Sequence, residues 1–208
     1  MQYHQQGKLE VICGSMFCGK TEELLRRLRR AEIAKKRVLT IKNHIDTRSG
    51  TTIITSHNGN IREAHPLENS PEMVELITRM AQDADVIGID EIQFFSDEIT
   101  HSLLSLVQQG KRIIVAGLDL DFKGEPFQTM ATLLALADDV CKLAAICISC
   151  GETAHFSQRL INGAPASFYD PIILVGAAEF YEARCRNCFV MKDHPHKMAP
   201  KKVFQTQI

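Results

Sequence analysis

Tryptophan is absent from this 208-residue sequence, and so is an excess of charge of either sign. The 24 basic and 25 acidic residues give a formal net charge of −1. A general nucleic-acid binder carries a marked positive charge, so the composition argues against a nucleic-acid partner. A local basic stretch, residues 26–37, falls on an expected helix together with acidic residues, and we interpret it as a solvated helix face.

Long apolar runs are lacking too. No run reaches the roughly 18 residues of a membrane span, and the opening segment MQYHQQGKLEV lacks the basic-then-apolar pattern of a secretory signal. We therefore expect a cytoplasmic protein that has no membrane partner. Four of the seven cysteines fall in two C-x-x-C pairs, and in a reducing compartment that pattern favours metal binding over disulfide formation.

Apolar segments alternate with amphipathic segments along most of the chain. The patterns predict strands at 9–13, 37–42, 86–90, 112–118 and 142–148, and helices that begin at residue 20 and that span 71–82, 97–109 and 129–139. Strands that alternate with helices predict an α/β fold, with a mostly parallel sheet that is covered by helices on both faces.

The periodicity weakens near the first C-x-x-C pair, which predicts a change of organisation. We expect a nucleotide-binding α/β domain over residues 1–146 and a small lobe with a long loop over residues 147–192. The remaining residues, 193–208, are rich in proline and lysine, and we expect a mobile tail there.

The segment GSMFCGKT matches the phosphate-binding pattern G-x-x-x-x-G-K-[ST]. An apolar strand precedes it and an amphipathic helix follows it, so that backbone N–H groups and the helix N-terminus would face the phosphates. Lys20 would reach the β and γ phosphates, and the Thr21 hydroxyl would bind Mg²⁺. The alternative is an ordinary strand-to-helix turn that contains glycine. The predicted phosphate-binding residues are Gly14, Ser15, Met16, Phe17, Cys18, Gly19, Lys20 and Thr21.

Two acidic residues, Asp90 and Glu91, stand at the carboxyl end of the apolar run VIGID. Ligands of open α/β sheets bind at that edge. Asp90 suits a second Mg²⁺ partner that acts through water, and Glu91 suits a group that accepts a proton from an attacking hydroxyl or water. The alternative is a solvent-exposed acidic turn. These residues alone do not separate a kinase from an ATPase.

Two C-x-x-C pairs predict a metal site. Cys147 and Cys150 form one pair, and Cys185 and Cys188 form the other, with residues 151–184 between the pairs. Four thiolates complete the tetrahedron that structural Zn²⁺ requires and leave no open position for catalysis. The long spacing predicts a loop that the metal holds at its base. The alternative is four unrelated thiols.

These motifs together resemble those of the thymidine kinases found in animals and many bacteria. The resemblance extends from about residue 7 to residue 192, and the herpesvirus type is not matched. It rests on GSMFCGKT (14–21), DTR (46–48), SHNG (56–59), DEIQFF (90–95), GLDLDFKGEPF (117–127) and CISC…GAAEFY…CRNC in that order. It implies a P-loop, RecA-like core, and a zinc-binding lobe whose loop closes like a lasso over the nucleoside.

The resemblance also implies a reaction and the residues that serve it. The γ-phosphate of ATP would pass to the 5′-hydroxyl of thymidine, and also of deoxyuridine, in nucleotide salvage. Glu91 would be the general base, Thr21 and Asp90 would serve Mg²⁺, and the four cysteines would hold zinc. Further nucleotide-binding residues would be Asp46, Arg48 and Gln93. The nucleoside would contact Met16, Phe94, Leu118, Phe122, Ser157, Leu174, Val175, Gly176 and Tyr181. From their own sequence context, the aromatic members of this set are core or surface residues.

The family further implies a homotetramer and feedback by thymidine triphosphate. The P-loop core alone leaves two other functions open, a RecA-like ATPase that acts on nucleic acid and a regulatory nucleotide-binding module without turnover. The net charge argues against the ATPase. The intact Lys20, Thr21, Asp90 and Glu91 argue against the module.

Overall fold

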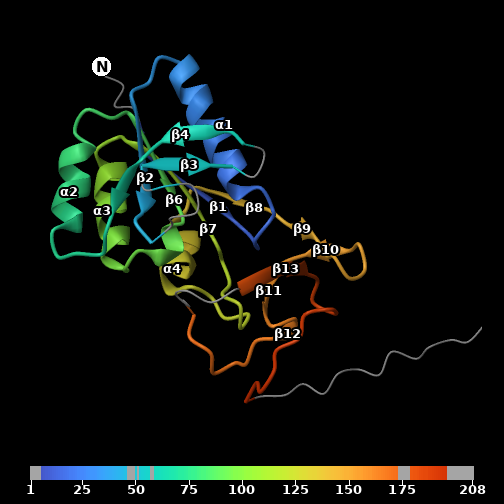
Figure 1. The fold of residues 1–208 in the computed structure, drawn as a ribbon. Helices are drawn as coiled ribbons and strands as arrows, with labels where there is room; N and C mark the ends of the chain where they lie inside the picture. The colour runs from blue at the N-terminus through green and yellow to red at the C-terminus, as the bar shows by residue number, and fades with distance from the viewer. Residues whose placement is uncertain (1–5, 46–49, 51, 57–58, 173–178, 196–208) are drawn as a thin grey trace, which may run out of the picture.

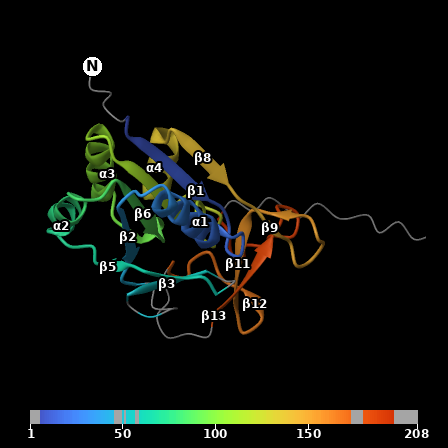
Figure 2. The same cartoon turned by 90° about the horizontal axis from the view of Figure 1, so that it is seen from above.

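The computed structural model describes residues 6–45, 50, 52–56, 59–172 and 179–195. Its main part is a six-stranded sheet in the order β5-β2-β6-β7-β1-β8 (Figures 1 and 2). All neighbouring strands in this sheet are parallel, as the sequence predicts. The strands are β1 (Lys8–Cys13), β2 (Val38–Asn43), β5 (His65–Leu67), β6 (Val86–Asp90), β7 (Arg112–Gly117) and β8 (Asp139–Lys142).

Helices cover both faces of this sheet, which confirms the predicted layers. Leu24 and Leu28 of the first helix pack on one face, against residues such as Ile114 of β7. The other helices pack on the opposite face, around a larger apolar core. Among the described helices, none combines the length and the apolar character needed to cross a membrane. The helices are α1 (Lys20–Ile33), α2 (Met73–Met80), α3 (Glu98–Gln108) and α4 (Gln128–Leu136).

The sheet ends earlier in the sequence than predicted. Helix α4 stops at Leu136, and residues 139–142 form β8, the edge strand that pairs with β1. The expected strand at 142–148 is wrong, because only β9 (Ala145–Ile146) forms there and it pairs with β10 (Thr153–Ala154). The apolar run misleads because Ile146 is 66% exposed whereas Ala145 is buried in the small lobe.

The polar segment 43–70 forms three short strands, of which the sequence predicts one, because its strand-like piece TTIITSH contains β3. Strands β3 (Ile53–Thr55) and β4 (Ile61–Glu63) form an antiparallel hairpin, and β5 joins the main sheet beside β2. The fully buried Lys42 ties this segment to the sheet, because its Nζ donates to the carbonyl oxygens of Gly50 at 3.1 Å and Ile53 at 3.0 Å.

The basic stretch on α1 is only in part the solvated face that we expected. Arg26 is exposed, but the side chain of Arg27 is only 13% exposed. Its guanidinium donates to the carboxylate of the buried Glu10 at 2.6 Å, and Arg112 donates to the same carboxylate at 2.7 Å. This ionic cluster lies at the amino ends of β1 and β7, opposite the phosphate loop.

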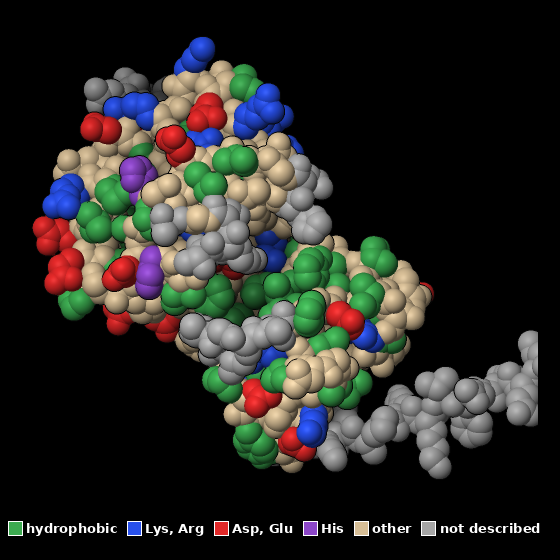
Figure 3. All heavy atoms as spheres, in the orientation of Figure 1, with side chains coloured by type: hydrophobic (Ala, Val, Ile, Leu, Met, Phe, Trp, Pro, Cys, Tyr) green, Lys and Arg blue, Asp and Glu red, His purple; other side chains and the backbone are tan. Residues whose placement is uncertain are grey.

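A small lobe lies beside the core (Figure 1). It contains the β9–β10 pair and an antiparallel sheet in the order β12-β11-β13. The strands of this sheet are β11 (Phe156–Ile161), β12 (Ala164–Pro165) and β13 (Glu179–Arg184). Hydrophobic side chains gather where the lobe meets the core (Figure 3). Of the expected mobile tail, residues 196–208 lie outside the described part of the chain.

Candidate active site

The phosphate loop connects β1 to α1, and its backbone requires glycine at both ends. Gly14 has a φ of 140° and Gly19 a φ of 86°, conformations that other residues rarely adopt. A Cβ atom on Gly14 would also lie 2.2 Å from the carbonyl oxygen of Leu143. Gly19 is the N-cap of α1, so the positive end of this helix points at the loop. The loop therefore has the geometry of an anion cradle.

Lys20 and Thr21 are the first residues of α1, and their side chains turn toward the phosphate loop and the end of β6. The buried Lys20 donates from Nζ to the Ser15 carbonyl oxygen at 2.7 Å, which folds the ammonium group back over the loop. The Thr21 hydroxyl donates to Oδ2 of Asp90 at 3.1 Å. Although β7 separates β1 from β6 in the sheet, α1 packs across these strands and brings Thr21 to the end of β6.

Glu91 sits in a strained turn directly after β6. Its φ of 51° and ψ of 42° are left-handed, which is uncommon for a residue that is not glycine. A short 3-10 helix, η1 (Ile92–Phe94), begins there. Nε2 of Gln93 donates to the Glu91 carboxylate at 2.6 Å, while the Leu118 N–H donates to Oε1 of Gln93 at 3.0 Å. The buried Gln93 is thus held by the N–H group that follows β7, and it in turn orients the Glu91 carboxylate.

Three of the predicted nucleoside-binding aromatic residues lie in two separate contacts, one around Phe94 and one around Phe122 and Tyr181. Phe94 packs edge-to-face on Phe127, with ring centroids 6.3 Å apart. Phe122 is buried, and the guanidinium of Arg159 lies over its ring and also donates to the Tyr181 hydroxyl. The sequence patterns do not single out Arg159 or Phe127. Arg159 follows Ser157 by two residues on β11, and strand alternation places both on one face.

Several predicted site residues cannot be placed, because they lie outside the described residues. These are Asp46, Arg48, Leu174, Val175 and Gly176.

The phosphate loop and the small lobe are in direct contact. The Met16 N–H donates to Oγ of Ser157 at 2.9 Å, and the Ser15 hydroxyl donates to the Ala154 carbonyl oxygen at 3.3 Å. Cys18 packs against the apolar interior of the lobe, whereas Phe17 points outward and is 57% exposed. These contacts join segments that are 139 and 141 positions apart in the sequence.

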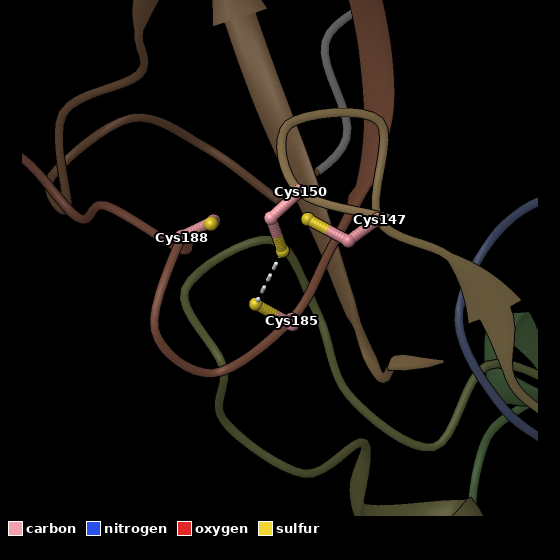
Figure 4. Close-up of side chains that lie close together, drawn as sticks. All are labelled: Cys147, Cys150, Cys185 and Cys188. Carbon is pink, nitrogen blue, oxygen red and sulfur yellow. Dashed lines mark hydrogen bonds between the residues drawn. The ribbon is translucent and has the colours of Figure 1, made fainter. Parts of the chain in front are cut away.

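The four predicted cysteine ligands converge on one point. Their side chains turn toward one another from two turns of the lobe (Figure 4), and all four Sγ atoms lie within 4.8 Å of each other. The Sγ atoms of Cys150 and Cys185 are 3.6 Å apart. A tetrahedral zinc with bonds of about 2.3 Å would separate its sulfur ligands by roughly 3.8 Å. The donor set therefore fits zinc.

The ionisation of these thiols also favours a cation. Desolvation raises the pKa of Cys147, but hydrogen bonds from backbone N–H groups outweigh it and lower this pKa to about 6. The side chain of Cys150, together with the other thiols, raises the pKa of Cys188 to about 12. The positive charge of a bound divalent ion would outweigh these thiol–thiol interactions and let all four sulfurs ionise.

Sequence comparisons with known proteins find strong similarity to one family. A family model described as thymidine kinase matches residues 7–189. A thymidine kinase of Coprothermobacter proteolyticus is 58% identical over 181 residues, which cover 87% of this chain and 89% of that protein.

Solved structures give a much weaker likeness. AMPPCP-bound DnaA from Aquifex aeolicus has 16% identity and a TM-score of 0.41, over 66% of this chain and 40% of that chain. The replication initiator DnaA bound to AMPPCP and single-stranded DNA has 18% identity and a TM-score of 0.42, over 69% of this chain and 41% of that chain. The chain thus spans less than half the length of these DnaA chains, and neither bears on its function.

Proposed function

Since the chain belongs to the thymidine kinase family, which implies thymidine and ATP as its substrates, we propose that Glu91 is the base for the transfer. The observation that carries this proposal is the buried turn in which Glu91 directly follows Asp90, whose carboxylate bonds the first turn of α1. The residue that would act on the acceptor hydroxyl, Glu91, therefore lies next to Asp90, which would serve the phosphates through Mg²⁺.

The phosphate end of the reaction falls to the loop and α1. The N–H groups of residues 14–21 would hold the β and γ phosphates of ATP, and Lys20 would exchange the Ser15 carbonyl for a phosphate oxygen. Thr21 and Asp90 offer hard oxygen ligands 3.1 Å apart and would hold Mg²⁺, with water between the ion and Asp90. When bound, Mg²⁺ would neutralise the charge that develops on the phosphates.

At the acceptor end, Glu91 would take the proton of the 5′-hydroxyl as its oxygen bonds to the γ-phosphorus. The bond between that phosphorus and the oxygen bridging to the β-phosphate breaks, and ADP leaves. Gln93 would keep the Glu91 carboxylate aimed at the hydroxyl through its bond at 2.6 Å. We therefore assign Gln93 to the base, in addition to the nucleotide-binding role that the family resemblance implies.

We further propose that the nucleoside lies between the loop and the lobe. Its base would contact Phe122 and Tyr181, which meet at Arg159, and the P-loop residue Met16, whose backbone bonds Ser157. The remaining proposed contacts are Phe94, Leu118, Leu174, Val175 and Gly176, and Asp46 and Arg48 would lie near the phosphates. Zinc on the four cysteines would hold the root of this lobe.

Properties of the whole enzyme are proposed from the family alone. They are a core over residues 1–146, a zinc-binding lobe over 147–192, a cytoplasmic homotetramer, feedback by thymidine triphosphate and acceptance of deoxyuridine. Phosphorylation assays with thymidine, deoxyuridine, deoxycytidine and deoxyguanosine test the acceptor range. Turnover of thymidine and deoxyuridine is expected, and equal turnover of deoxyguanosine would contradict a pyrimidine pocket.

The base assignment predicts the effect of Glu91→Gln. The amide cannot take the proton, so kcat should fall by about 10²- to 10⁴-fold. The dissociation constant of ATP, measured by titration calorimetry, should stay within about twofold, because the loop is untouched. Glu98→Gln, at an exposed position in the first turn of α3, is the matched control and should keep normal turnover. Near-normal kcat in Glu91→Gln would remove the assignment.

A further inference from the structure

Arg159 lies on β11, and its side chain is completely buried. Each part of its guanidinium has a partner. Nε donates to the Tyr181 hydroxyl at 3.0 Å, Nη1 to the Pro171 carbonyl oxygen at 2.6 Å, and Nη2 to the Ile172 carbonyl oxygen at 2.9 Å. A guanidinium is costly to bury unless its N–H groups are bonded, so these contacts hold one another in place.

The same guanidinium also lies over two aromatic rings. Its central carbon lies 4.2 Å from the centroid of the Phe122 ring and 5.7 Å from that of Tyr181. Contacts of this kind are attractive, and most strongly so away from water. One side chain thus joins β11 to β13, to the segment that ends at residue 172 and to the loop after β7.

The position of Arg159 also connects these groups to the phosphate loop. It pairs directly with Tyr181 across the β11–β13 ladder. Ser157, on the same face of β11, accepts the Met16 N–H from the phosphate loop at 2.9 Å. A shift of Arg159 would therefore move the walls of the proposed nucleoside site relative to the phosphates.

We propose that Arg159 is a positioning residue for the nucleoside, which sets the Phe122 ring and the Tyr181 phenol at the separation that a pyrimidine base requires. This inference rests on the proposed function, in which these two residues contact the base. Lysine could not replace it, because an ammonium group lacks the planar fork of N–H groups that bonds these three acceptors.

The test compares Arg159→Lys and Arg159→Met with the wild-type enzyme in steady-state kinetics. The KM for thymidine should rise by about tenfold or more, which is the loss expected for a charge-assisted hydrogen-bond network. The KM for ATP and the zinc content should stay within about twofold of wild type, because the phosphate loop and the cysteines keep their own contacts. Direct binding of thymidine, measured by calorimetry, should weaken in parallel.

The matched control is Arg112→Lys. Arg112 is partly buried and bonds Glu10 at the amino ends of the strands, away from the proposed site. The variant should leave both KM values unchanged. Tyr181→Phe provides a second, milder probe, because it removes only the hydroxyl that accepts from Nε. It should raise the KM for thymidine in the wild-type background and add little to Arg159→Lys. If Arg159→Met does not fold, Arg159→Lys and Tyr181→Phe still test the inference.

Two results would overturn the inference. One is a thymidine KM that is unchanged in Arg159→Lys, and the other is an equal rise in the KM of thymidine and of ATP, which indicates a merely structural role. Both presuppose a wild-type enzyme that phosphorylates thymidine. A wild-type protein that does not do so would instead contradict the proposed function.

Discussion

Gly117, the last residue of β7, is surrounded so closely that no side chain fits there. A Cβ atom at this position would lie 2.5 Å from Oε1 of Gln93 and 2.8 Å from Cγ2 of Ile92. Gln93 is the residue that donates to the Glu91 carboxylate. The absence of a side chain at Gly117 is therefore a condition for the orientation of the proposed base.

This crowding predicts the effect of Gly117→Ala. The added methyl group should displace the Gln93 amide and disorient Glu91, so kcat should fall by about tenfold or more, since small misplacements near the chemistry are costly. ATP binding, which depends on the phosphate loop, should be retained. Gly163→Ala, in the turn between β11 and β12, is the control: its left-handed φ of 78° makes alanine strained there, but a Cβ atom would meet no neighbour, so the variant reports backbone strain far from Glu91. Equal kcat values in the two variants would contradict this account.

Single residues also show what the sequence can and cannot predict about the site. The phosphate loop, Asp90, Glu91 and the cysteines stand out because their chemistry depends on neighbours a few positions away. The orienting role of Gln93 does not stand out, because it depends on the Leu118 N–H, 25 residues further along. The same holds for Arg159, whose ring partner Phe122 lies on another segment.

At the scale of elements, the turns after β9 and β13 carry the cysteines and so set the geometry of the lobe. Cys147 and Cys185 are buried, and they join the apolar interior against which Cys18 of the phosphate loop packs. Loss of metal should therefore loosen the lobe and weaken its contacts with the loop.

We accordingly expect about one zinc ion per chain in freshly purified protein, as measured by mass spectrometry of the metal. Removal by a chelator should lower the unfolding temperature and raise the KM for thymidine. Cys188→Ser should do the same, whereas Cys141→Ser, on β8, should keep the metal. A protein that contains no zinc would remove the proposed root of the lobe.

The elements themselves were predictable where several side chains repeat one pattern. Helices α1 and α3 have clear apolar stripes, and β6 is buried along its whole length. The boundary near residue 142 was not predictable, because an edge strand such as β8 exposes alternate side chains while the apolar run after it belongs to another layer. Strand β5 was missed because it has only three residues and contains a proline.

For the whole molecule, the carboxyl ends and the amino ends of the sheet strands have separate roles. The carboxyl ends of β1 and β6 carry the site, and the amino ends of β1, β7 and β8 carry the ionic cluster around Glu10. Desolvation alone would raise the pKa of Glu10, but its bonds with Arg112 and Arg27 outweigh desolvation and hold the pKa below its ordinary value of 4.5. A carboxylate with a lowered pKa stabilises the fold at neutral pH, and this contribution is lost as the pH falls.

We therefore expect Glu10→Gln to lower the free energy of unfolding at pH 7 by about 1–3 kcal/mol, because it leaves buried donors without their charged partner. Below pH 4.5 the difference from wild type should shrink, since the Glu10 carboxyl of the unfolded chain then takes up protons, whereas the native carboxyl, whose pKa is lowered, does so only at lower pH. Thermal unfolding followed by circular dichroism at pH 7 and pH 4 measures both effects. Glu63→Gln, at an exposed site on β4, should change stability little. A difference that is constant with pH would refute the ionic explanation.

The contact between the phosphate loop and the lobe has a consequence for the order in which the protein is made. Met16 and Ser157 are 141 positions apart, and Ser15 and Ala154 are 139 apart. Strand β1 pairs with β7 and β8, so a growing chain can complete the sheet around the loop and α1 only shortly before the ribosome adds the residues of the proposed acceptor side. If the nucleoside binds between the loop and the lobe, as proposed, phosphate transfer becomes possible only once the lobe has been synthesised and has docked.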